Sequence, residues 1–151
     1  MRLPPLHLVA PSERYRDGFL RALQEFRSEG LPWWLGPELD LAERDFAAFV
    51  ALKLADAAPG SGIEKTHLWG VSGDDVVGRI SVFHRLDDAL RRSGGHIGYD
   101  TVPSSRGRGV ATEMLRQVLP VARSLGLTEV LLTCDDDNAA SIRVIERNGG
   151  V

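Results

Sequence analysis

The chain has 151 residues, of which 43% are hydrophobic and 26% are charged, and its formal net charge is -3. This length and composition are those of an ordinary globular protein, so we expect a single domain over residues 1–151. The slight acidity gives no reason to expect a nucleic acid or an anionic membrane as a partner. Cys134 is the single cysteine, which excludes an internal disulfide and a cysteine-based metal site. The start of the chain lacks the apolar core of a signal peptide, so we expect a cytoplasmic protein.

The first 30 residues predict a short strand followed by a helix. Leu6–Val9 is a run of residues that suits a strand. Ser12 then serves as a helix cap, because its side-chain oxygen is able to accept from the first free N–H groups. Apolar residues recur at helical spacing after it, and Gly30 is the expected end of this helix.

A second helix is predicted after a loop with two adjacent tryptophans. Asp40, with Glu43 three residues later, resembles a capping box, and the helix should run towards Leu54. In the preceding loop, Trp33 and Trp34 are either a lid that faces a substrate or an anchor that packs the loop against the core. Both interpretations stay open at the level of sequence.

Three strands are predicted in the middle of the chain. His67–Val71 and Val76–Arg85 flank Ser72–Asp75, whose glycine and aspartates are typical of a hairpin turn. Leu86–Gly95 is a charged connection. His96–Val102 is the third strand of this group.

The most informative stretch is the glycine-rich turn at residues 106–111, which follows this third strand and opens a long amphipathic helix. That helix should reach Leu125 and stop at Gly126. The first turn of a helix leaves backbone N–H groups without partners and carries partial positive charge, and Arg106 and Arg108 add to that charge. We therefore predict a site for a phosphate-bearing ligand, in the form of a pyrophosphate.

Two further elements complete the predicted order. Glu129–Cys134 has the pattern of a buried strand, and Asp137 or Asn138 caps a last helix that ends near Asn148. This alternation of strands and helices indicates the α/β class, with layers of helix around one sheet.

The order of elements, the Arg-x-x-Gly-x-Ala turn and the asparagine that heads the last helix together resemble the GNAT superfamily of N-acetyltransferases. Arg106, Gly109 and Ala111 match its pyrophosphate signature. The segments Gly94–Tyr99 and Cys134–Ser141 are similar to a bacterial group within it. The resemblance implies the GNAT acyl-CoA N-acyltransferase fold, with a central mixed sheet flanked by helices. It also implies a C-terminal hairpin, which this sequence lacks.

Acetyl-CoA is the co-substrate that the resemblance implies, with no metal. The pyrophosphate is expected on the N–H groups of the glycine turn, and the pantetheine arm beside the strand before it. The residues implied to bind the cofactor are Tyr99, Thr101, Val102, Arg106, Gly107, Arg108, Gly109, Val110, Ala111, Asn138, Ser141 and Arg143.

Acetyl transfer to an amine needs a base for the amine proton and an acid for the departing thiolate. The candidate bases are His84, His96, Asp100 and Glu29. The usual acid of the superfamily is a tyrosine seven residues after the asparagine, but this chain has Ile145 there. Tyr99 is the expected replacement if its hydroxyl faces the cofactor.

We expect direct acetyl transfer to an amine on a small molecule or a peptide. A non-catalytic acyl-CoA-binding or interaction module is the alternative, which Ile145 and the lacking hairpin favour. A nucleotide- or phosphometabolite-binding protein is a third interpretation. The edge left open beside Glu129–Cys134 predicts a homodimer, because unpaired strand edges associate.

Overall fold

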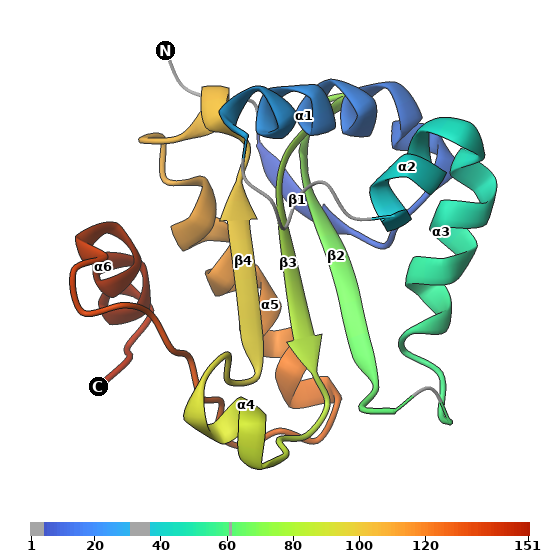
Figure 1. Ribbon diagram of the computed structural model, residues 1–151. Helices are drawn as coiled ribbons and strands as arrows, with labels where there is room; N and C mark the ends of the chain where they lie inside the picture. Colours follow the sequence, from blue (N-terminus) through green and yellow to red (C-terminus); the bar gives the residue numbers. More distant parts are fainter. Residues whose placement is uncertain (1–4, 31–36, 61) are drawn as a thin grey trace.

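The computed structural model describes residues 5–30, 37–60 and 62–151, and its centre is a four-stranded antiparallel sheet (Figure 1). The strands lie in the order β1-β2-β3-β4, so β4 is an edge strand. Their bounds are Leu6–Val9 for β1, Lys65–Ser72 for β2, Asp75–Phe83 for β3 and Ile97–Thr101 for β4.

Helices cover both faces of this sheet, as Figure 1 shows. On one face lie α1, α2 and α3, and on the other lies α5, which begins directly after the glycine turn. A short α4 links β3 to β4, and α6 lies beyond the open edge of β4 (Figure 1). The helices span Arg16–Glu29 (α1), Pro37–Arg44 (α2), Phe46–Ala55 (α3), Asp88–Arg92 (α4), Val110–Ser124 (α5) and Ala139–Arg147 (α6), with 3-10 turns at Glu13–Tyr15 and Pro103–Ser105.

Each face of the sheet has its own apolar core. On the α1 side, the Trp69 indole contacts the ring of Phe19, with centroids 4.7 Å apart, and Phe46 and Phe49 surround it. On the α5 side, the Met114 side chain lies over Gly70 and Gly78, which pair across β2 and β3. A side chain at either glycine would occupy the space of Met114, so the two glycines bring α5 close to the sheet.

Most predicted elements are confirmed, and the α/β class with a helix-flanked sheet is confirmed with them. The Ser12 side chain accepts from the Arg14 N–H, and Gly30 ends α1. The turn at residues 72–75 joins β2 and β3, and the Asn138 side chain caps α6.

Two predictions about helices are wrong. The helix expected from Asp40 to Leu54 is two helices, because the Asp45 carboxylate accepts from the Ala48 N–H and starts α3 anew. The charged connection at residues 86–95 contains α4, which the Asp87 side chain caps through the Leu90 N–H. Trp33 and Trp34 lie outside the described residues.

The strand predicted at Glu129–Cys134 does not form. The segment makes one isolated bridge, between Leu132 and Gly95, beside the bond that the His96 N–H donates to the Leu131 carbonyl. Gly95 has a φ of 63°, which turns the chain away from the geometry of a ladder at this point. The homodimer predicted through that strand therefore loses its stated basis, and the open edge belongs to β4.

No helix in the described part of the chain has both the length and the apolar character needed to cross a bilayer.

The contact between Gly18 of α1 and the β2–β3 turn gives a test of the packing. Alanine usually stabilises a helix relative to glycine, but a methyl group at Gly18 would approach the Asp74 carbonyl oxygen within 2.4 Å. We expect Gly18→Ala to lower the free energy of unfolding by about 1–3 kcal/mol, measured by urea denaturation. Gly98→Ala is the control, since a methyl group there meets nothing within 4 Å. A stabilised Gly18→Ala protein would contradict this packing.

Candidate functional site

The glycine turn before α5 presents free backbone donors to a cavity. Gly107 and Gly109 have φ values of 76° and 78°, a conformation that other residues rarely adopt. Gly109 caps α5 without a side-chain bond, so the N–H groups of the first helical residues have no carbonyl partner within the helix. A cavity of about 580 Å³ opens in front of them, between this turn, β4 and α6.

The outer edge of β4 forms a second wall of this cavity. The Val102 N–H donates to the Val77 carbonyl over 2.9 Å, and the Phe83 N–H donates to the His96 carbonyl over 2.7 Å. Backbone direction alternates along an antiparallel strand, so Tyr99 and Thr101 turn their N–H and C=O groups outward, away from β3. The outer edge of β4 therefore offers backbone donors and acceptors to a ligand at these two residues.

The head of α6 closes the cavity from the far side. The Asn138 side chain accepts from the Ser141 N–H over 3.1 Å, and the Ser141 hydroxyl lies 2.5 Å from the Tyr99 hydroxyl. The Tyr99 side chain is half-buried between β4 and α6, and burial raises the pKa of its phenol. A hydroxyl pair therefore faces the cavity from two elements that are 42 residues apart.

The structure brings together all the predicted cofactor residues in this cavity except Val102 and Arg108. Val102 is buried and has its N–H bonded to β3, and Arg108 lines a separate cavity beside α1. Arg106 lines the predicted cavity, but its guanidinium also binds the Glu29 carboxylate of α1 at 2.5 and 3.0 Å. Arg147 is a further cation on the cavity wall, and no sequence pattern predicted it.

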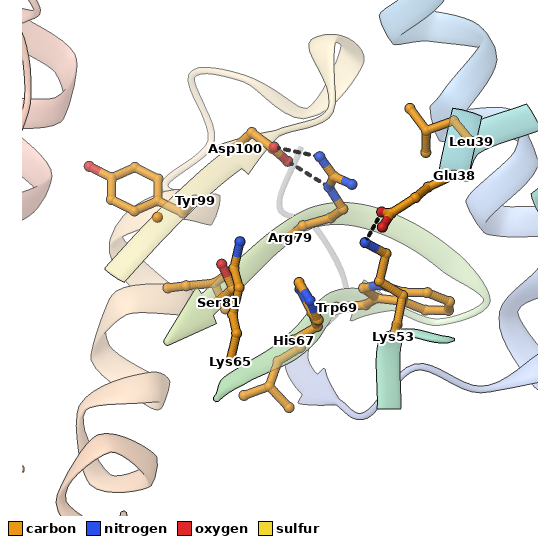
Figure 2. Close-up of a pocket in the computed structure, with 13 residues that line it drawn as sticks. Glu38, Leu39, Lys53, Lys65, His67, Trp69, Arg79, Ser81, Tyr99 and Asp100 are labelled. Carbon is orange, nitrogen blue, oxygen red and sulfur yellow. Dashed lines mark hydrogen bonds and ion pairs between the residues drawn. The ribbon is translucent and has the colours of Figure 1, made fainter. Parts of the chain in front are cut away.

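A second cavity, of about 520 Å³, lies on the opposite face of the sheet, under α2 and α3 (Figure 2). Its charged lining was not predicted, since the sequence-based strand began at His67 and left out Lys65. The signal that could have predicted it is the spacing of Lys65 and His67, which lie two residues apart on β2. They therefore share one face of the sheet with Arg79 of β3. The cavity is lined by Glu38, Leu39, Lys53, Lys65, His67, Leu68, Trp69, Arg79, Ile80, Ser81, Gly98, Tyr99 and Asp100.

Two ion pairs stand in this second cavity (Figure 2). The Arg79 guanidinium binds the Asp100 carboxylate at 3.1 and 3.4 Å, and Lys53 pairs with Glu38 at the outer wall. Burial raises the pKa of Asp100 above its ordinary value of 3.8, although the arginine opposes that shift. Asp100 is therefore a carboxylate with an increased affinity for a proton.

His67 in the same cavity is neutral at pH 7. Burial lowers its pKa to about 4, although its Nε2 lies 2.7 Å from the Asp56 carboxylate. Because that carboxylate only accepts, the proton of the neutral ring is on Nε2.

The two cavities share Tyr99 and Asp100. These neighbours on β4 point to opposite faces of the sheet, and Figure 2 shows the Tyr99 ring directed away from Lys65 and His67. A ligand along the outer edge of β4 and a second ligand over the sheet would thus meet at this strand, with one titratable group beside each.

The other three candidate bases lie elsewhere. The His84 ring bonds to the Thr66 hydroxyl at 2.7 Å and lines neither cavity. The His96 Nδ1 accepts from the Leu131 N–H at 2.9 Å beside a different surface hollow. The pKa of Glu29 is lowered by its bond to Arg106, which makes it a poor base. Of the four, only Asp100 reaches both cavities.

No group of three or more His, Cys, Asp or Glu side chains stands in a metal-binding arrangement within the described residues.

Comparisons with known proteins agree with this fold. The Acetyltransferase (GNAT) domain family matches residues 6–151. A mycothiol acetyltransferase from Geodermatophilus obscurus is 30% identical over 120 residues, which are 77% of this chain but only 34% of that protein. The chain thus spans about a third of this curated relative.

Solved structures share the fold at low sequence identity. RimJ of Mycobacterium smegmatis, in complex with CoA-disulfide, has a TM-score of 0.66 at 19% identity, covering 96% of this chain and 70% of that one. The microcin C7 self-immunity acetyltransferase MccE, in complex with acetyl-CoA and AMP, has a TM-score of 0.63 at 17% identity, covering 95% and 77%. With its family match, its sheet and its glycine turn before α5, the chain belongs to the GNAT acetyltransferase family.

Proposed function

We propose that this chain transfers the acetyl group of acetyl-CoA directly to a primary amine. The observation that carries the proposal is that a cofactor-sized cavity and a second cavity meet at Tyr99 and Asp100. Membership of the family supports acetyl-CoA as the donor, as does the acetyl-CoA bound in MccE. The solved structure of RimL, a ribosomal L7/L12 alpha-N-protein acetyltransferase, has a TM-score of 0.63 at 16% identity and supports an amine acceptor without identifying it.

In this proposal the coenzyme runs from the glycine turn along the edge of β4. The pyrophosphate accepts from the free N–H groups at the start of α5, where the helix dipole and Arg106 favour negative charge. The pantetheine arm bonds to the outward backbone groups of Tyr99 and Thr101, as an added strand would. An outward N–H also suits the thioester oxygen, which gains negative charge during transfer.

The acceptor amine then approaches from the second cavity. Its nitrogen bonds to the thioester carbon, the C–S bond breaks, and the sulfur leaves with the electron pair. Asp100 takes the proton from the nitrogen, and the Tyr99 hydroxyl, paired with Ser141, gives a proton to the sulfur. Proton exchange with solvent then restores the Asp100 carboxylate and the Tyr99 phenol. Tyr99 thereby replaces the family tyrosine whose position Ile145 occupies.

A charge placed at the glycine turn tests the cofactor site. Gly109→Glu sets a carboxylate against the phosphates, and like charges in contact cost several kcal/mol. We expect the affinity for acetyl-CoA, measured by calorimetry, to fall at least about 100-fold. Gly126→Glu is the matched control, since Gly126 at the other end of α5 also has a positive φ and open space. Equal affinity losses in the two variants would refute this site.

The proposed acid is tested by Tyr99→Phe. We expect kcat for thiol release to fall about 100-fold, because the thiolate then lacks its positioned proton donor. The KM for acetyl-CoA should change little, since the backbone of β4 remains. Tyr15→Phe, at the only other tyrosine, should leave kcat unchanged. A full kcat in Tyr99→Phe would remove Tyr99 from the mechanism.

The proposed base is tested by pH. Asp100 accepts a proton only above its own pKa, which burial raises, so kcat/KM for the amine should fall as the pH drops through a value above 3.8. Asp100→Asn should remove this limb and lower kcat about 100-fold or more. Asp75→Asn, which breaks the exposed pair of Asp75 with Arg21 at 2.9 Å, is the control. An unaltered pH profile in Asp100→Asn would exclude Asp100 as the base.

A further inference from the structure

The second cavity carries one positive charge that has no carboxylate partner among the described residues. Lys53 pairs with Glu38 and Arg79 pairs with Asp100, so two of its three cations are balanced. Around Lys65, no carboxylate in the described part of the chain lies within ion-pairing distance, and its ammonium instead lies 4.6 Å from the centre of the Phe83 ring. His67 adds no charge at pH 7, because its pKa is about 4.

The charges around Lys65 favour an incoming anion. Lys65 is half-buried, and its pKa is lowered by this burial and by the positive charges of Lys53 and Arg79, against weaker support from Asp56 and Glu38. The Asp56 carboxylate accepts from His67 rather than from Lys65. An anionic group in the cavity would therefore form the ion pair that Lys65 lacks, at a site already partly shielded from water.

The floor of the cavity is a shallow trough that crosses the sheet. His67, Ser81 and Gly98 face one another on β2, β3 and β4, and all three line the cavity. Arg79 and Asp100 stand along one side of this row. Lys65 and Phe83 stand along the other side, because they pair two residues further along the strands. The small residues at the β4 end leave room for a ligand to lie across the strands.

The register separates Lys65 from Asp100, beside which the acceptor amine reacts. Lys65 on β2 is two strands across from β4, and it lies four residues along β2 from Trp69, which stands in the same row as Arg79 and Asp100. Strand geometry therefore sets the Lys65 backbone about 10 Å across and about 14 Å along the sheet from Asp100. The Lys65 ammonium lies over the Phe83 ring on β3, one strand nearer to β4. The acceptor amine belongs beside Asp100, and the opposite end of the acceptor reaches Lys65.

We infer that the acceptor is an elongated amine with a carboxylate at the end away from its nitrogen, and that Lys65 binds this carboxylate. The inference rests on the proposed acetyl transfer for the position of the amine. The position of the carboxylate rests on the unpaired ammonium and the trough alone.

Triglycine and triglycinamide are the matched probes, since they differ only in the terminal carboxylate. We expect the full chain, with and without coenzyme A, to bind triglycine at least about tenfold more tightly than triglycinamide in calorimetry. Lys65→Met should abolish this preference, and Lys65→Arg should retain it. The double variant Glu38→Gln with Lys53→Met removes a balanced pair from the same cavity and should also retain it. Equal binding of the two peptides, or a preference that survives in Lys65→Met, would overturn the inference.

Thiol release with the same two peptides separates this inference from the proposed function. A tenfold higher kcat/KM for triglycine supports both. A carboxylate preference in binding, with no thiol release from either peptide, supports the recognition site and contradicts the transferase. Equal kcat/KM for the two peptides supports the transferase and contradicts the role of Lys65.

Discussion

The unpaired outer edge of β4 is the constraint on which the site depends. A strand at a sheet edge carries backbone N–H and C=O groups that need partners, and here Tyr99 and Thr101 direct theirs into a cavity. The segment at residues 131–133 covers only the beginning of this edge, because Gly95 turns the chain there. At the other end of the same edge, the glycine turn starts α5 with further free N–H groups. Two sets of backbone donors result, one along β4 and one at the start of α5, and a coenzyme with a pyrophosphate and an amide-bearing arm suits both.

Because side chains alternate along β4, neighbouring residues of this strand direct their side chains to opposite faces of the sheet. Tyr99 points towards the cavity in front of the glycine turn and Asp100 towards the second cavity, although they are neighbours in the chain. Burial raises the pKa of both side chains, which keeps the phenol protonated and strengthens the carboxylate as a base. In the proposed mechanism, a proton donor and a proton acceptor are thereby held on opposite faces of a single strand, with no flexible loop between them.

The sequence predicted the cofactor side of this site far better than the acceptor side. The glycine turn, α5 and the Asn138 cap are local features, and local patterns of glycine, apolar spacing and capping predict them. The second cavity, the proposed acceptor site, depends on cross-strand register, which places Lys65, Ser81 and Asp100 on one face. Its outer wall depends on the ion pair of Lys53 with Glu38. Likewise, no short-range pattern indicates that Arg106 meets Glu29, 77 residues away. The strand expected at residues 129–134 does not form for a related reason. A strand needs a neighbouring strand to pair with, and the turn at Gly95 ends the pairing after one bridge.

The exchange rates of the Tyr99 and Thr101 amide protons, followed by NMR, test the central claim most directly. Both N–H groups point to the open edge of β4, so acetyl-CoA should slow their exchange by pairing with them. ADP should bind only at the turn before α5, so the exchange of these two amide protons should stay fast when ADP is bound. Protection by acetyl-CoA alone is the result we predict. Unchanged exchange with acetyl-CoA bound would show that the coenzyme does not lie along β4, and would contradict the site described above.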